Sequence, residues 1–347
     1  KAEGTASAEG AVSAEGAVSA EGAVSGEAAG AVAYYVFNAG DGEGFVVVSG
    51  DDRTPAILGY TDQGAFDLSN VPENMQAWLD DYARQIDYLD AHPQMKMAKA
   101  PASEHAAISP MLTSTWNQGA PYNNLCPRDG NNRSVTGCVA TAMAQVMYYW
   151  KWPQEACKTI PSYSSDWNMQ RTLSELEPKA FDWDNMIDVY TSAATNAQKN
   201  AVAELMLYVG HSIKMGYGPA SGAWSGNCAI ALRNYYDYDP NLYHADHGSY
   251  TFQEWEDLIY TELAAGRPVL ISGDNSDLTG GHEWVCDGYD GNGCYHQNWG
   301  WGGMSDGYFV LTVMQPDNQG TRSRSRRPMS DGSRRYAGRR MPSPVRY

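Results

Sequence analysis

One cysteine lies at a position where a helix would activate it. Cys138 follows Thr136 and Gly137 and directly precedes Val139–Trp150, which is predicted to be a helix because of its apolar composition and the proline at position 153. A cysteine reacts as its thiolate, and the amides and positive dipole end of a helix N-terminus favour that form. A buried structural cysteine is also common in such a place, and this residue taken alone favours the structural interpretation.

A histidine in the C-terminal half could serve as the base for such a cysteine. His282 follows two glycines in T-G-G-H-E-W-V at a predicted strand start, from which an imidazole can reach a helix terminus in a facing layer. A structural loop histidine is the alternative. The six other histidines have no comparable setting: His92, His105, His211, His244, His247 and His296. The H-x-x-H pair at 244 and 247 lacks a third ligand at metal-binding spacing, so we expect no metal site.

Three further side chains could complete a catalytic group. The carbonyl of Asn298 could accept the second ring N–H of His282 and fix its tautomer, and Trp299 could cover that bond. Gln118 lies twenty residues before Cys138 and could donate its amide to an oxyanion. The backbone N–H of Cys138 would be the second oxyanion donor.

The order Gln, Cys, His, Asn and the local sequences around these residues resemble one enzyme family. The runs T-W-N-Q-G-A-P-Y-N, T-G-C-V-A-T-A-M-A-Q-V-M, G-G-H-E-W-V and N-W-G-W-G-G-M-S-D-G-Y-F are similar to those of streptopain-like cysteine peptidases, the C10 family of clan CA, over about residues 33–318. The resemblance implies Cys138 as nucleophile, His282 as general base and acid, and Asn298 as the orienting group. It further implies Trp299 as a shield and Gln118 in the oxyanion hole.

The resemblance also implies an α+β, papain-like fold and a secreted bacterial zymogen. A helical subdomain and an antiparallel-sheet subdomain would follow a small α+β prodomain that inhibits the enzyme. The expected reaction is peptide-bond hydrolysis through an acyl-enzyme, with protein or peptide substrates and no cofactor or metal. Two alternatives stay open: a Cys-His acyl transferase, and an inactive binding or inhibitor protein of the same fold.

The segment 33–91 is predicted to be the small α+β unit. Short β-rich runs at Ala33–Asn38 and Gly44–Ser49 flank a glycine-rich loop, and Pro55–Tyr60 could add a strand. Apolar residues recur at helical spacing from Val71 to about Asp90. Residues 92–107 are rich in alanine, proline and lysine, and we expect an exposed linker that contains the activation cleavage site, near Lys96 or Lys99.

The segment 108–318 is predicted to form the peptidase domain, with helices first and strands later. The helices expected after Val139–Trp150 are Asn200–His211 and Phe252–Ala265. The strands expected are Pro268–Ser272, Glu283–Tyr289, Gly293–Asn298 and Gly307–Val313. This order is typical of an α+β domain rather than of alternating α/β units. The glycine-rich run Tyr217–Gly226 could line a cleft or form a plain surface connection.

Composition excludes several classes of protein. The 347 residues carry a formal net charge of −17, which disfavours binding of the folded part to nucleic acid. The sequence contains no apolar run of the length that a membrane span requires. Six cysteines without a C-x-x-C pair give no support for a zinc ribbon or a disulfide-built scaffold, and we expect Cys126 to be a bystander.

Both ends of the chain differ from the middle. Residues 1–32 repeat S-A-E-G-A-V, which cannot bury much apolar surface, so we expect a flexible tract. Residues 319–347 hold nine arginines, and we expect a disordered basic tail in place of the closing strand and loop of the family. No signal-peptide pattern is visible, so the expected secreted location, extracellular, periplasmic or on the outer surface of a bacterium, rests on the resemblance.

Overall fold

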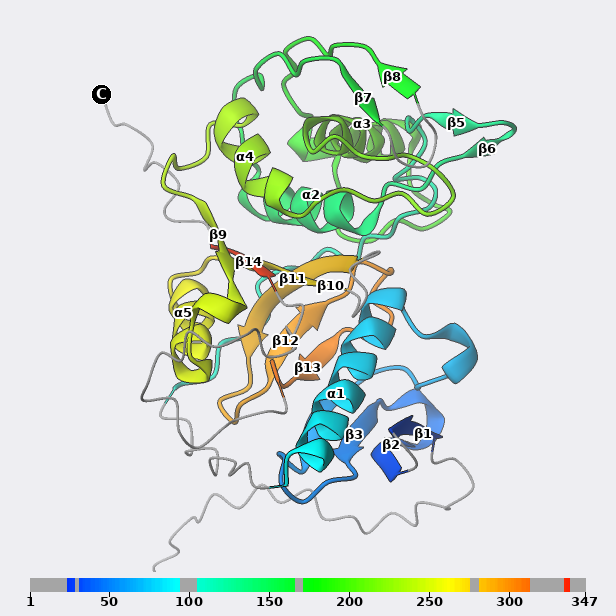
Figure 1. The fold of residues 1–347 in the computed structure, drawn as a ribbon. Coiled ribbons are helices and arrows are strands. Elements are labelled where there is room, and N and C mark those ends of the chain that lie inside the picture. The colour runs from blue at the N-terminus through cyan, green and yellow to red at the C-terminus, as the bar shows by residue number, and fades with distance from the viewer. Residues whose placement is uncertain are drawn as a thin grey trace, which may run out of the picture.

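The fold combines one large antiparallel sheet with two groups of helices (Figure 1). It was obtained as a computed structural model, which describes residues 24–28, 31–93, 105–165, 171–274, 281–312 and 334–337. The helices are α1 (Glu73–Ala91), α2 (Cys138–Trp150), α3 (Asn196–Ser212), α4 (Gly226–Tyr235) and α5 (Phe252–Ala264). The strands of the large sheet are β1 (Val24–Ala28), β2 (Ala31–Asn38), β3 (Phe45–Ser49), β4 (Ile57–Thr61), β9 (Tyr243–Asp246), β10 (Val269–Asp274), β11 (Gly281–Tyr289), β12 (Tyr295–Asn298), β13 (Gly307–Phe309) and β14 (Arg334–Ala337). Two small hairpins are formed by β5 (Arg128–Asp129) with β6 (Asn132–Arg133) and by β7 (Tyr163–Ser165) with β8 (Arg171–Leu173).

The large sheet runs through both the N-terminal unit and the C-terminal half of the chain. Its strand order is β1-β2-β3-β4-β13-β12-β11-β10-β14-β9. The two halves meet where β4 pairs with β13, with Tyr60 opposite Tyr308 and Gly59 opposite Phe309. The predicted strands of the N-terminal unit therefore exist, and they extend the sheet of the larger domain rather than forming a separate one.

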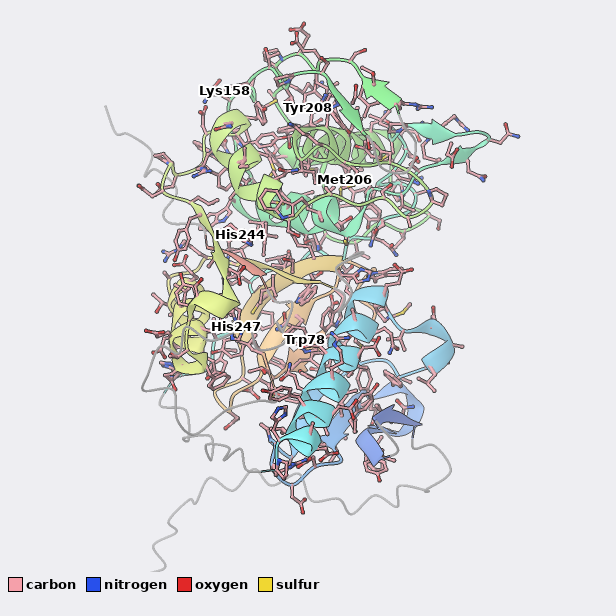
Figure 2. All side chains as sticks on the ribbon, viewed as in Figure 1. Trp78, Lys158, Met206, Tyr208, His244 and His247 are labelled. Atoms are coloured by element: carbon pink, nitrogen blue, oxygen red, sulfur yellow. The ribbon has the colours of Figure 1, made fainter. Side chains whose placement is uncertain are left out.

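Two hydrophobic cores hold the molecule together. One lies among α2, α3 and α4, the group that Figure 1 shows above the sheet. The other lies between the sheet, α1 and α5, and it joins residues of the N-terminal unit to residues of the C-terminal strands. Trp78 of α1 packs edge to face on Trp284 of β11, with ring centroids 5.3 Å apart, at the position labelled in Figure 2. This arrangement confirms the expected helical part, sheet part and preceding α+β unit.

The helix starts follow local capping chemistry. α3 begins at Asn196 rather than at the predicted 200, because Thr195 and Gln198 form a capping box. α5 begins as predicted, with a second capping box between Thr251 and Glu254. α4 was not predicted: it begins at the end of the glycine-rich run 217–226, and its ten residues are too few to show a clear apolar period.

The two ends of the chain differ from the expectation of no regular structure. β1 lies inside the repeat segment 1–32 and pairs with β2. β14 lies inside the segment 319–347 and pairs with β10 on one side and β9 on the other, so it occupies the place of a closing strand. Main-chain hydrogen bonding to a neighbouring strand edge does not require apolar side chains, which explains why composition failed to indicate either strand.

The predicted linker 92–107 lies mostly outside the described residues, and so do Lys96 and Lys99. Its last part is held on the larger domain: the ring of His105 stacks on that of Tyr260 with centroids 3.8 Å apart, and the Tyr260 hydroxyl donates to the Ala106 carbonyl over 3.1 Å. None of the described helices is long and apolar enough to cross a lipid bilayer.

The β4–β13 junction depends on a glycine. A Cβ added at Gly59 would lie 2.1 Å from Cδ1 of Phe309, whose side chain is fully buried. We therefore expect Gly59→Ala to lower the free energy of unfolding by about 1–3 kcal/mol, the usual cost of overpacking. Urea titration followed by tryptophan fluorescence measures it. Gly40→Ala is the control, because a Cβ there meets no atom within 4 Å; equal stability of the two variants would contradict the analysis.

Candidate active site

Cys138 is the first residue of α2, and its buried sulfur lies against main-chain amides. Gly137 before it has a φ of +85°, and a Cβ there would lie 2.9 Å from the carbonyl oxygen of Ser221, so the turn into the helix requires glycine. Burial raises the pKa of the Cys138 thiol to about 11. The backbone N–H groups of Glu283, Val139 and Cys138 itself oppose that rise. In this state of the chain the sulfur is therefore a neutral thiol with thiolate-stabilising donors already in place.

His282 lies on β11, one residue before the amide that faces this sulfur. Strand β11 therefore passes the N-terminal end of α2, which a reaction between Cys138 and His282 would require. The ring of His282 is half-buried, and burial lowers its pKa while the carboxylate of Glu73 raises it. Glu73 is the first residue of α1. His282 makes no hydrogen bond to any residue that the structure describes, and the charge that acts on its ring belongs to the N-terminal unit.

Asn298 is held by groups other than His282. Its Oδ1 accepts from Nε2 of Gln145 over 3.0 Å and from the Gly300 amide over 3.1 Å, and its Nδ2 donates to the Ser114 carbonyl over 2.8 Å. The strand register explains this, because Asn298 pairs with Val285 and not with the end of β11 that carries His282. The predicted hydrogen bond between Asn298 and His282 is therefore not formed among the described contacts.

Gln145 is a site residue that the sequence analysis missed. It lies on α2 seven positions after Cys138, so it faces the same side of the helix two turns on. Its Oε1 accepts from the Trp116 amide and from the Ser114 hydroxyl, while its Nε2 holds Asn298. The available signal in the sequence was a single amide side chain in a mostly apolar helix; once buried, such an amide must find partners.

Gln118 and Trp299 lie in different parts of the structure: Gln118 lies beside the turn into α2, and Trp299 lies in the core of the sheet. The Gln118 carbonyl accepts from the Thr136 amide over 3.1 Å, which fixes the Gln118 segment beside the turn into α2. The side chain of Gln118 makes no hydrogen bond to the described residues. Trp299 is fully buried in the sheet core: its ring lies 5.3 Å from that of Trp284, and its Nε1 donates to the Ser305 carbonyl over 2.8 Å. It does not cover a His282–Asn298 bond in this arrangement.

A residue of the N-terminal unit enters the seam between β11 and the loop after β12. Nδ2 of Asn74 donates to the carbonyls of Glu283 and Trp299, over 2.9 and 3.0 Å, and its Oδ1 accepts from Nε1 of Trp301 over 3.1 Å. Asn74 is fully buried. The two carbonyls belong to the residues that directly follow His282 and Asn298, so α1 ties down both segments that carry these side chains.

The remaining candidates lie away from this seam. His244 is on β9 and His247 follows it near α5, where Figure 2 labels both. The part of the chain that the structure describes contains no group of three or more His, Cys, Asp and Glu side chains suited to a metal ion. The six cysteines all lie in that part, are buried, and form no disulfide with one another.

Comparisons with known proteins identify the family of the chain. A model of the peptidase C10 family matches residues 116–309, and a model of the Spi protease inhibitor matches residues 5–86. Streptopain of Streptococcus pyogenes serotype M1 is 37% identical over 308 residues, covering 83% of this chain and 76% of that protein. The thiol protease/hemagglutinin PrtT of Porphyromonas gingivalis is 33% identical, covering 83% of this chain and 35% of that protein.

Solved structures give the same result. A fragment of Prevotella intermedia prointerpain A, with a cysteine mutated to alanine, superimposes with a TM-score of 0.76 at 30% identity, over 91% of this chain and 97% of that one. Active interpain A from the same organism superimposes with a TM-score of 0.58 at 33% identity, over 69% of this chain and 97% of that one. The chain therefore belongs to the peptidase C10 family, as a cysteine peptidase that carries an inhibitor-type unit ahead of its catalytic domain.

Proposed function

We propose that Cys138 is the nucleophile and His282 the general base and acid of a secreted cysteine endopeptidase that is made as a zymogen. The observation that carries the proposal is the crossing of β11 over the start of α2, with the Glu283 amide against the Cys138 sulfur. That crossing sets an imidazole-bearing residue next to a thiol at a helix N-terminus, the setting in which thiols become nucleophilic. Secretion is supported only by the family resemblance.

The proposed reaction has two halves. The Cys138 thiolate attacks the peptide carbonyl carbon, and the side-chain amide of Gln118 with the backbone N–H of Cys138 holds the oxyanion. Protonated His282 gives its proton to the leaving amine, which breaks the C–N bond and leaves an acyl-enzyme. Neutral His282 then takes a proton from water, whose oxygen attacks the acyl carbon and releases Cys138.

The N-terminal unit 33–91 is proposed to block this chemistry as an inhibitory prodomain. Asn74 occupies main-chain acceptors beside both His282 and Asn298, and the carboxylate of Glu73 acts electrostatically on the His282 ring. A tethered blocker acts at high effective concentration. A cut within 92–107, near Lys96 or Lys99, would release it, after which Asn298 could orient His282 and Trp299 could shield the pair.

Loss of the sulfur tests the nucleophile. We expect Cys138→Ala to abolish both self-processing and peptide hydrolysis, because the proposed acyl-enzyme forms on this sulfur. Mass spectrometry of the full chain over time reports processing and its position. Cys126→Ala is the control, since Cys126 is a buried thiol with no role in the proposed site. A Cys138→Ala chain that processes at the wild-type rate would refute the assignment.

Asn298→Ala should reduce kcat by less than Cys138→Ala does, because Asn298 orients the base and does not react. KM should change little. Steady-state kinetics of the processed chain with a fluorogenic peptide measure both constants. Asn227→Ala is the comparison variant, since its amide donates to the Ile213 carbonyl within the helical subdomain. A kcat for Asn298→Ala as low as that of Cys138→Ala would contradict the orienting role.

Asn74→Ala tests the inhibition. The substitution removes the bonds to Glu283, Trp299 and Trp301, at about 1 kcal/mol each, and leaves buried carbonyls unpaired. We expect at least about tenfold faster labelling of Cys138 by an epoxide probe in the uncleaved chain. Gln76→Ala is the matched control on the same helix, since its side-chain amide donates to Asp80 of α1 itself. Equal labelling of both variants and wild type would overturn the inhibitory role of Asn74.

A further inference from the structure

A buried carboxylate on β11 binds two other segments of the catalytic half and takes no part in the proposed mechanism. Asp287 is fully buried, and its Oδ1 accepts from Nδ1 of His296 on β12 over 2.6 Å. Its Oδ2 accepts from the Leu112 amide over 2.7 Å, and its main-chain carbonyl accepts from the Met111 amide over 3.1 Å. Both carboxylate oxygens therefore have donors, as a buried acid requires.

Asp287 lies at an irregularity of the sheet. The register between β11 and β12 shifts between Cys286 and Gly288, so Asp287 is the extra residue of a β-bulge. The pairing of β11 with β10 ends at the same place, where Cys286 lies opposite Val269. Asp287 is thus found where β11 leaves β10 and takes a new neighbour.

The new neighbour of β11 is the segment 105–112, which we call the strap. Ile108 and Tyr289 exchange two main-chain hydrogen bonds, of 2.7 and 2.8 Å. A Cβ added at Gly288 would lie 3.0 Å from the Ile108 carbonyl oxygen, so the strap lies directly against β11. The carboxylate in the bulge then binds the amide of Leu112, the last residue of the strap.

The residues that follow the strap contact the polar groups of the candidate active site. The Ser114 carbonyl accepts from Nδ2 of Asn298 over 2.8 Å, and the Ser114 hydroxyl donates to Oε1 of Gln145 over 3.0 Å. The same Oε1 accepts from the Trp116 amide over 3.2 Å. Gln118, the proposed oxyanion donor, lies two residues further on. A displacement of the end of the strap would therefore reach both Asn298 and Gln118.

We propose that Asp287 is a positioning residue for the peptide hydrolysis: by holding the end of the strap, it keeps Asn298 and Gln118 in the places from which they act. The inference rests on the proposed roles of these two side chains. Because the strap is bonded to β11, it stays on the catalytic half when the N-terminal unit leaves.

His296 is the charged partner of Asp287. A carboxylate only accepts, so Nδ1 of the ring carries a proton in this bond. Burial lowers the pKa of His296, but the hydrogen bond and the charge of Asp287 raise it above its ordinary value. Asp306, between β12 and β13, and Asp62, directly after β4, act in the same direction, and the Tyr308 ring of β13 packs with its centroid 5.2 Å away. The site therefore favours the protonated ring.

Asp287→Asn tests the role with a side chain of the same shape. Its single oxygen can still accept from the Leu112 amide, and its N–H can donate to Nδ1 of a neutral His296. A protonated His296 has N–H on both ring nitrogens, so one of the two donors then faces another donor. We expect kcat of the processed chain, relative to wild type at the same pH, to fall about tenfold between about pH 8 and about pH 5, with KM little changed.

Steady-state kinetics with a fluorogenic peptide measure this ratio. Asp239→Asn is the matched control, because its carboxylate accepts from the Asn241 amide in the loop between α4 and β9, and its ratio should not vary with pH. Adding His296→Gln to Asp287→Asn should remove the pH dependence, since a glutamine amide does not titrate and can present either its donor or its acceptor. A ratio for Asp287→Asn that is the same at every pH would overturn the positioning role.

Hydrogen exchange in the uncleaved Cys138→Ala chain tests the same link without turnover. Peptides that cover 108–118 should exchange faster with Asp287→Asn added than without it at about pH 5, and at a similar rate at about pH 8. Equal exchange at both pH values would contradict the proposal. Failure of the proposed function is distinguishable, because a wild-type chain that hydrolysed no peptide would leave this exchange difference intact.

Gly288→Ala provides the test if Asp287→Asn does not fold. The added Cβ would lie 3.0 Å from both the Ile108 carbonyl oxygen and the Cβ of His296, so it displaces the strap while the carboxylate is kept. We expect faster exchange in 108–118 and a kcat below that of wild type. Faster exchange together with a wild-type kcat would overturn the proposal, because the strap would then not position the site.

Discussion

The contact between the start of α2 and the first residues of β11 is the constraint on which the rest of the structure depends. A helix from one core and a strand from the other meet there, and main-chain amides of both are directed at the Cys138 sulfur. Gln145 reinforces the meeting two turns along α2 by binding Asn298 of β12. Main-chain donors and the buried Gln145 amide fix this geometry in addition to apolar packing. Each of these polar groups needs its partner, because leaving it buried and unpaired would cost free energy of folding.

The N-terminal unit binds beside this same contact, at β11 and the loop after β12. Its strand β4 pairs with β13 and so continues the sheet, and its helix α1 packs against β11. Asn74 of α1 also donates to carbonyls on the two segments that carry His282 and Asn298. The inhibitor-type unit therefore shares the hydrophobic core of the catalytic half instead of covering it from outside. Shared strands and shared apolar packing therefore join the inhibitor-type unit to the catalytic half.

Much of this architecture is readable in the sequence, for physical reasons that differ between elements. The strong apolar periodicity of α1 and the caps of α5 are local signals, and so the predicted helices appear. The catalytic pairing of Cys138 with His282 stays a prediction; what the structure shows is the amide of Glu283, the next residue on β11, at the Cys138 sulfur. Two elements were not predicted. Strand β14 depends on main-chain pairing with β9 and β10, which are distant in the sequence, and α4 is too short to show a clear apolar period. The partners of Asn298 follow from strand register, which no residue pattern in β12 reveals.

The β4–β13 pairing has a consequence for the proposed release of the N-terminal unit. Strand β13 would change from an interior strand to the border of the remaining sheet, and its unpaired main-chain groups at Tyr308 and Phe309 would meet water. The aromatic rings of Tyr60 and Tyr308, stacked 5.4 Å apart, would separate as well. The proposed release would thus expose a strand edge three residues long, and such a short edge limits unwanted pairing with other extended chains.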